Sequence, residues 1–161
     1  MSIAKGSKLP QADLLKLGEG GPEKLALSEV IGAGRAVVFA VPGAFTPTCT
    51  NSHMPSFVKN AQAFRDKGVP VVAVTVNDPF VADAWAKATG ATDAGITVLA
   101  DADGAFTKAI GMDFDAAPAG LYGRSKRYAM IVDNGSVDVL EVEDKPGVCS
   151  VTGGDSILKQ L

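Results

Sequence analysis

The residue best suited to chemistry is Cys49, which follows a short apolar run and falls in the first turn of an expected helix. Pro47 suits the first helical position, because the N–H that proline lacks would be unpaired there anyway, and Thr46 is a candidate N-cap. The free backbone N–H groups and the dipole of a helix start both favour a thiolate. The thiolate is the nucleophilic form of cysteine, so Cys49 is a candidate nucleophile.

A second interpretation of Cys49 stays open at this level, because free cysteine is often simply a small buried apolar residue. The position three residues earlier would hold a second cysteine in a dithiol motif, and here it holds Thr46. If Cys49 is reactive, the spacing therefore favours a single nucleophile over direct dithiol exchange.

The composition excludes several classes of protein. The chain of 161 residues has a formal net charge of −3 and no basic run, which argues against a nucleic-acid partner. Two cysteines and one histidine exclude a disulfide-dense scaffold and leave no recognisable zinc site. No apolar stretch approaches the ~20 residues that a membrane helix needs. We expect no metal, no cofactor and no membrane partner.

The beginning of the chain carries no targeting signal that we recognise. Residues Met1 to Pro10 have neither an apolar signal core nor an arginine-rich amphipathic stretch. We therefore expect a cytoplasmic location.

The elements that must position Cys49 follow from the apolar pattern. Continuous apolar runs predict buried strands at residues 36–41, 69–76 and 96–100. Helices are expected from Thr46, over 79–89, over 106–110 and over 155–161. Residues 127–142 contain Asn134-Gly135 between two strand-like runs, which predicts a tight hairpin. Residues 10–34 are expected to form a loose lead-in with a short helix at 28–31.

This order of elements predicts an α/β fold with a central mixed sheet and helices on both faces. The terminal hairpin argues against a purely parallel sheet, and a thioredoxin-like arrangement fits better. No linker, repeat or change in composition divides the chain, so we expect one domain over residues 1–161.

A longer pattern around Cys49 resembles the active-site motif of the peroxiredoxins. The motif is Pro42-x-x-x-Thr46-x-x-Cys49, and its continuation through His53-Met54-Pro55 to Phe57 resembles the type II, peroxiredoxin-five-like group. Further matches follow in family order: Val74-x-Val76-Asn77-Asp78-Pro79-Phe80-Val81, Trp85, Leu99-Ala100-Asp101, Gly104-Ala105-Phe106 and Arg124-Ser125-Lys126-Arg127-Tyr128-Ala129-Met130. The resemblance covers nearly the whole chain.

The resemblance implies a thioredoxin fold and a thiol-dependent peroxidase that reduces hydrogen peroxide and alkyl hydroperoxides. Cys49 matches the peroxidatic cysteine, which becomes a sulfenic acid. Thr46 matches the threonine that holds the peroxide, and Pro42 matches the proline that shields the thiolate. Arg127 matches the active-site arginine, while Arg124, in the same block, is the weaker candidate.

The fate of the oxidised cysteine depends on the second cysteine, Cys149. Some relatives carry a resolving cysteine in this C-terminal loop, so the resemblance implies an intramolecular disulfide between Cys49 and Cys149. The alternative is an inert, partly buried thiol. The resemblance further implies thioredoxin or glutaredoxin with glutathione as reductant, and a homodimer.

Two alternatives remain open on the sequence alone. His53 lies four residues after Cys49, on roughly the same helix face, where it could act as a base; we favour a packing or hydrogen-bonding role. The whole chain could also be a non-enzymatic redox sensor or interaction module that uses the same reactive Cys49.

Overall fold

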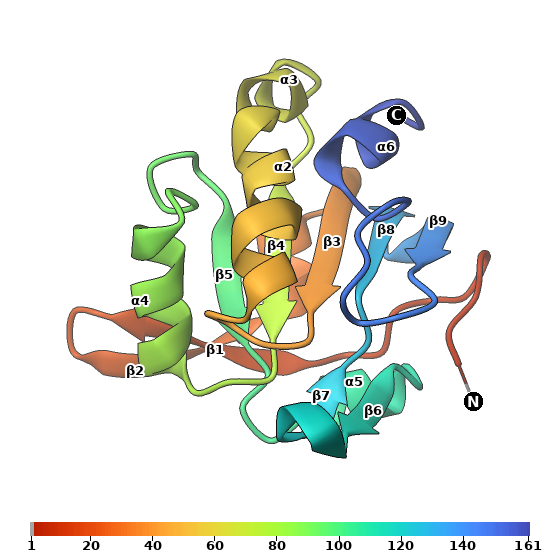
Figure 1. The fold of residues 1–161 in the computed structure, drawn as a ribbon. Helices are drawn as coiled ribbons and strands as arrows, with labels where there is room; N and C mark the ends of the chain where they lie inside the picture. The colour runs from red at the N-terminus through yellow and green to blue at the C-terminus, as the bar shows by residue number, and fades with distance from the viewer. Residues whose placement is uncertain (1) are drawn as a thin grey trace.

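The computed structural model describes residues 2–161, and a seven-stranded mixed sheet forms its centre (Figure 1). The strand order is β2-β1-β5-β4-β3-β8-β9. The three central strands run parallel, as the apolar runs predict: β3 (Arg35–Val41), β4 (Val71–Thr75) and β5 (Thr97–Ala100). All residues of β4 are buried, and of β3 only Arg35 is exposed, which explains why both strands are almost entirely apolar.

The hairpin predicted at residues 127–142 is confirmed. Strands β8 (Tyr128–Asp133) and β9 (Ser136–Val142) pair antiparallel, and β8 also pairs antiparallel with β3. The turn residues Asn134 and Gly135 have φ angles of 51° and 78°, the left-handed values that a two-residue turn of this kind requires.

The lead-in is more ordered than the sequence indicates. Residues 10–34 contain an antiparallel hairpin of β1 (Asp13–Gly18) and β2 (Gly21–Ala26) before helix α1 (Leu27–Ile31). Strand β2 is a mostly exposed edge strand that carries a proline and charges, so it lacks the apolar pattern of a strand. A two-stranded sheet of β6 (Asp113–Ala116) and β7 (Leu121–Ser125), joined by the short helix η2 (Ala117–Ala119), was likewise not predicted.

Helices cover both faces of the large sheet, so the predicted fold class is confirmed. One apolar cluster packs residues of α2 (Met54–Lys59), α3 (Ala61–Asp66), α4 (Pro79–Ala88) and α6 (Gly154–Leu158) against β3. The opposite cluster contains residues of α1 and α5 (Ala105–Ala109). In residues 2–161, no helix is long and apolar enough to span a membrane.

Candidate active site

The loop that follows β3 is held by hydrogen bonds to two other segments of the chain. The N–H of Ala44 donates to Asn77 Oδ1 at 3.0 Å, and Arg124 Nη1 donates to the Pro42 carbonyl at 3.4 Å. A Cβ at Gly43 would meet Arg124 Nη1 at 2.7 Å, so a larger residue here would displace the end of this side chain. Arg124 therefore supports the loop that leads to Cys49, which matches its lower rank among the candidates.

The helix begins at Pro47, as the sequence predicts, but Thr46 does not cap it. The Thr46 hydroxyl donates to the Gly43 carbonyl at 2.7 Å instead of accepting from the first turn. This interaction uses the one hydroxyl proton and leaves the oxygen lone pairs free to accept a further hydrogen bond. The N-cap interpretation is therefore wrong, and the hydroxyl oxygen does not have to serve both a cap and a substrate.

Cys49 and His53 are placed by a wide helical turn, η1 (Cys49–His53), which is a π-helix in which the N–H of Met54 pairs with the Cys49 carbonyl. Such turns are rare and are often found at functional sites. Both side chains are fully buried. The turn brings the sulfur and the imidazole into contact with the same residue, Arg127, which directly precedes β8.

Arg127 is the centre of the site and is only 2% exposed. Its Nη2 donates to Cys49 Sγ at 3.2 Å and to the Pro146 carbonyl at 2.8 Å, and Nε donates to the same carbonyl at 3.3 Å. Its Nη1 lies 2.9 Å from His53 Nδ1. No salt bridge of Arg127 with a carboxylate occurs in residues 2–161. A buried guanidinium without a carboxylate partner keeps its positive charge available to the groups that it touches, Cys49 Sγ among them.

The contacts of His53 determine its protonation. Arg127 can only donate, so His53 Nδ1 must accept, and Nε2 therefore carries the proton and donates to the Thr152 carbonyl at 3.0 Å. Burial and the charge of Arg127 lower the pKa of His53 from 6.5 to about 3. A neutral imidazole with both nitrogens occupied matches the hydrogen-bonding role that we favoured over a base.

A hollow of about 310 Å³ lies beside the cysteine, and Pro42, Thr46 and Arg127 all line it. The rest of its wall is largely apolar, with Ala116, Ala119 and Leu121 from the β6–β7 region. Cys49 does not line the hollow itself, but Arg127 connects the hollow to its sulfur. The predicted residues thus meet at one place, and the space beside them suits a small polar molecule with an apolar substituent.

The second cysteine lies in the segment that covers the site. Cys149 is a free, half-buried thiol whose Sγ is 3.8 Å from Thr152 Oγ1, and burial raises its pKa. Its neighbours Pro146 and Gly147 line the same hollow as Arg127. The two cysteines therefore belong to one region of the fold, although a hundred positions separate them in sequence.

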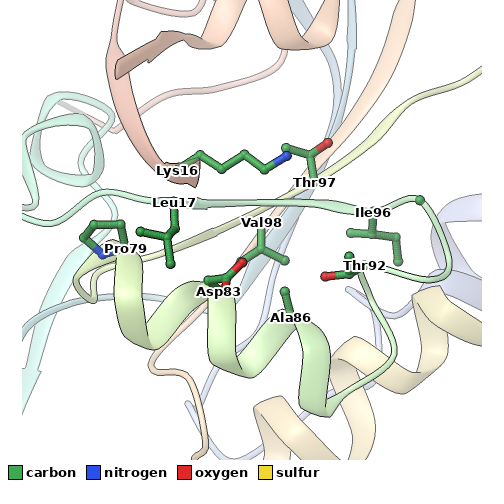
Figure 2. A pocket seen from close by; sticks show the side chains of 10 residues that line it. Lys16, Leu17, Pro79, Asp83, Ala86, Thr92, Ile96, Thr97 and Val98 are labelled. Atoms are coloured by element: carbon green, nitrogen blue, oxygen red, sulfur yellow. The ribbon is translucent and has the colours of Figure 1, made fainter. Parts of the chain in front are cut away.

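Another hollow, of about 170 Å³, lies between β1, α4 and β5 (Figure 2). Lys16 and Asp83 are its charged wall residues, and Asp83 already pairs with Lys87 at 2.9 Å. None of the candidate site residues lines it. Among the described residues, no cluster of three or more histidine, cysteine or acidic side chains could hold a metal ion.

Sequence reasoning missed three partners of the site: the carbonyls of Pro146 and Thr152, and the buried carboxylate of Glu143. The carbonyls belong to the backbone, so no residue type announces them. Glu143 follows a strand of alternating polar and apolar residues and is followed by two charged residues, a pattern that is typical of an exposed strand end.

Comparisons with known proteins identify the family of the chain. The family model described as Redoxin matches residues 4–158. Two rice (Oryza sativa) proteins are similar: peroxiredoxin-2E-2, chloroplastic, is 40% identical over 99% of this chain and 73% of its own length, and peroxiredoxin-2C is 39% identical over 99% and 98%. The crystal structure of reduced Prx3 from Vibrio vulnificus in complex with H2O2 covers 98% of each chain at 43% identity, with a TM-score of 0.89. The chain therefore belongs to the peroxiredoxin family and is a thiol peroxidase related to its type II members.

Proposed function

We propose that Cys49 is the peroxidatic cysteine and that Arg127, Thr46 and Pro42 support its reaction. The observation that carries this proposal is the 3.2 Å contact between Arg127 Nη2 and Cys49 Sγ in a buried site. A guanidinium at this distance stabilises the thiolate and also presents donors toward the neighbouring hollow. Pro42 is buried at the same wall and keeps water away from the sulfur.

The proposed first step is a nucleophilic attack of the Cys49 thiolate on the peroxide. Cys49 sulfur bonds to one oxygen, the O–O bond breaks, and hydroxide or alkoxide leaves and takes a proton from solvent. Cys49 becomes a sulfenic acid. Negative charge moves from sulfur to the leaving oxygen, so donors fixed along that path stabilise the transition state more than the ground state. Thr46 Oγ1, free to accept, orients the peroxide O–H.

In the second step we propose that Cys149 resolves the sulfenic acid. Its sulfur attacks Cys49 sulfur, a disulfide forms, and water leaves with the sulfenic oxygen. The disulfide is then reduced by thioredoxin or by glutaredoxin with glutathione, which returns both thiols. The position of Cys149 in the segment covering Arg127 supports this role. Burial raises the pKa of Cys149, which favours the neutral thiol while the segment stays in this position.

Mass spectrometry tests the second step. One equivalent of H2O2, followed by non-reducing digestion, should yield linked peptides of Cys49 and Cys149 and a loss of two mass units. The Cys149→Ser variant should instead accumulate sulfenic acid, trapped by dimedone. Sulfenic acid accumulating in the unmodified protein would show a one-cysteine enzyme, for which a glutathione and glutaredoxin system is the better reductant.

A homodimer is proposed on the basis of exposed aromatic side chains near the active-site loops. Phe45, Phe80 and Tyr122 are 54%, 59% and 66% exposed. Residues beside them are hydrogen-bonded to one another, since Ala44 contacts Asn77 and Arg124 contacts Pro42. Sedimentation analysis should show a dimer that Phe80→Asp weakens, whereas a monomer at all concentrations would refute the proposal.

Two further proposals concern the chain as a whole. We propose one redoxin-type domain, supported by a single large sheet that takes strands from residues 13 to 142. It should unfold in one cooperative transition. We also propose a cytoplasmic location, consistent with two free thiols. The rice relative named chloroplastic indicates that location varies in the family, so a tagged chain should be localised directly.

A further inference from the structure

Glu143 is a buried carboxylate that has no part in the chemistry described so far. It follows directly on β9 and is 7% exposed. Its carboxylate accepts from the backbone N–H groups of Ser150, Val151 and Thr152 at 2.9, 2.9 and 2.8 Å. It also accepts from the hydroxyls of Ser150 and Thr152 at 2.9 and 2.7 Å. Burial by itself raises the pKa of Glu143, but the hydrogen bonds to its anionic form outweigh this effect and lower the pKa to about 2.

These contacts bind the end of the segment 144–152 to Glu143, the residue that directly precedes the segment. The segment leaves the sheet at Glu143 and returns to the same carboxylate through Thr152. Between those points it carries Pro146, which contacts Arg127, and Cys149. Two further attachments are hydroxyl groups: Thr48 donates to the Gly147 carbonyl at 3.1 Å, and Ser156 donates to the Ser150 carbonyl at 3.2 Å.

The closed segment holds Arg127 at two points. The Pro146 carbonyl accepts directly from Nε and Nη2 of Arg127. The Thr152 carbonyl accepts from His53 Nε2 at 3.0 Å, and His53 Nδ1 accepts in turn from Arg127 Nη1 at 2.9 Å. An unbroken series of hydrogen bonds therefore runs from the carboxylate of Glu143 to the guanidinium that touches Cys49.

The segment is otherwise loosely supported. One hollow of about 170 Å³ is lined by Arg127, Glu143 and Pro146, and the 310 Å³ hollow beside the cysteine is lined by Arg127, Pro146 and Gly147. Residues 144–148 are all exposed. Val148 and Val151 are both exposed and belong to neither apolar cluster of the core, so the closed position depends largely on hydrogen bonds.

We propose that Glu143 is a positioning residue that latches the segment 144–152 over the reactive cysteine. While its carboxylate holds residues 150–152, Arg127 is fixed against Cys49 and Cys149 is kept back. When the carboxylate releases them, Cys149 is freed and Arg127 loses both of its carbonyl-based supports. This proposal rests on the proposed roles of Cys49 and Arg127.

The test compares Glu143→Gln with Glu141→Gln, a matched control two residues earlier on β9 whose side chain contacts only Gln160 among the hydrogen bonds of residues 2–161. The amide of glutamine turns one acceptor into a donor, which opposes the N–H groups of residues 150–152. Hydrogen exchange of peptides from 144–152, measured on the reduced protein, reports the latch without any peroxide.

Two measurements of thiol reactivity should then change in opposite directions: the rate of Cys149 should rise and the rate of Cys49 should fall. In a Cys49→Ser background, Glu143→Gln should increase the rate of Cys149 with 4,4′-dithiodipyridine about tenfold. In a Cys149→Ser background, it should decrease the rate of Cys49 with H2O2 about tenfold. General loosening of the fold would expose both thiols and would not slow Cys49 selectively. Glu141→Gln should change neither rate.

The Ser150→Ala variant replaces Glu143→Gln in the test if Glu143→Gln does not fold. It removes one hydroxyl contact to Glu143 from an exposed residue. Both thiol rates should then shift in the same directions as in Glu143→Gln, by a smaller factor. Unchanged exchange at 150–152, or faster exchange with an unchanged Cys49 rate, would overturn the latch. If Cys49 of the parent protein does not react with peroxide, the proposed function fails, while exchange and Cys149 reactivity still judge the latch separately.

Discussion

Arg127 and Glu143 are neighbours at the ends of adjacent strands, where the N–H of Glu143 donates to the Arg127 carbonyl at 3.0 Å, yet their side chains point to different partners. The carboxylate contacts residues 150–152, and the guanidinium contacts Cys49, His53 and Pro146. If the two charges paired with each other, the guanidinium would be neutralised where the reaction needs it. Their separation leaves the positive charge available to the sulfur.

The role of Arg127 depends on its planar fork as well as on its charge. Arg127→Lys should lower the second-order rate of Cys49 oxidation about a hundredfold, because an ammonium cannot contact Cys49, His53 and Pro146 together. Stopped-flow fluorescence of Trp85, whose indole N–H donates to Thr50 next to Cys49, provides the signal. Arg124→Lys is the matched control, and its rate should stay within about twofold of the parent. Equal losses in both variants would remove the special role of Arg127.

The contributions of the methyl and hydroxyl groups of Thr46 can be measured separately with two variants. Thr46→Val keeps the shape but removes the hydroxyl that donates to the Gly43 carbonyl, so the free energy of unfolding should fall by about 1 kcal/mol. The rate with H2O2 should fall more, by about tenfold or greater, because the acceptor for the peroxide O–H is also lost. Thr46→Ser should retain most of the rate in the same assay. A normal rate in Thr46→Val would show that the hydroxyl only braces the loop.

The neutral state of His53 has a consequence for stability. Its pKa is about 3 in the folded protein and 6.5 ordinarily, so the unfolded chain binds more protons between those values. The free energy of unfolding should therefore decrease as pH falls below 6.5, by up to about 1.4 kcal/mol per pH unit. Urea unfolding at pH 7 and pH 5 measures this loss.

A matched variant identifies the group responsible. The His53→Asn variant keeps a side-chain acceptor near the position of the ring Nδ1, and asparagine does not titrate. The free energy of unfolding of this variant should therefore change less between pH 7 and pH 5 than that of the parent. Glu143, with a pKa near 2 against an ordinary 4.5, contributes stability that is present above pH 4.5 and is lost only below it. Since the chain has a single histidine, equal slopes in parent and variant would contradict the neutral assignment.

The local part of the site was predictable from the sequence, and the long-range part was not. Pro42, Thr46 and Cys49 lie within eight positions of one another, so a strand, a loop and a helix start place them together. The roles of Pro42 and Thr46, however, come from the family resemblance. Arg127 was found only through the family resemblance, because a charged residue before a strand is usually solvated. The relation of His53 to Thr152 spans 99 positions and uses a backbone carbonyl, which has no sequence signal.

The same distinction explains the fold. Buried parallel strands are mostly apolar, and an Asn-Gly turn specifies its own hairpin, so β3, β4, β5, β8 and β9 were predicted. The β1–β2 hairpin was missed because β2 is exposed and polar, and its glycine-rich turn resembles a loop. Strands β6 and β7 are short, with Ser125 as their only buried residue, and form only when they pair with each other.

The central claim is that the sulfur of Cys49 reduces the peroxide, and H2O2 consumption by Cys49→Ser with dithiothreitol as reductant tests it most directly. Serine is nearly isosteric, but its hydroxyl is barely ionised at neutral pH, so turnover should fall below roughly 1% of the parent rate while the fold is retained. Cys149→Ser, assayed beside it, should still oxidise Cys49 at the parent rate in the first turnover. Substantial peroxide consumption by a folded Cys49→Ser protein would contradict the account.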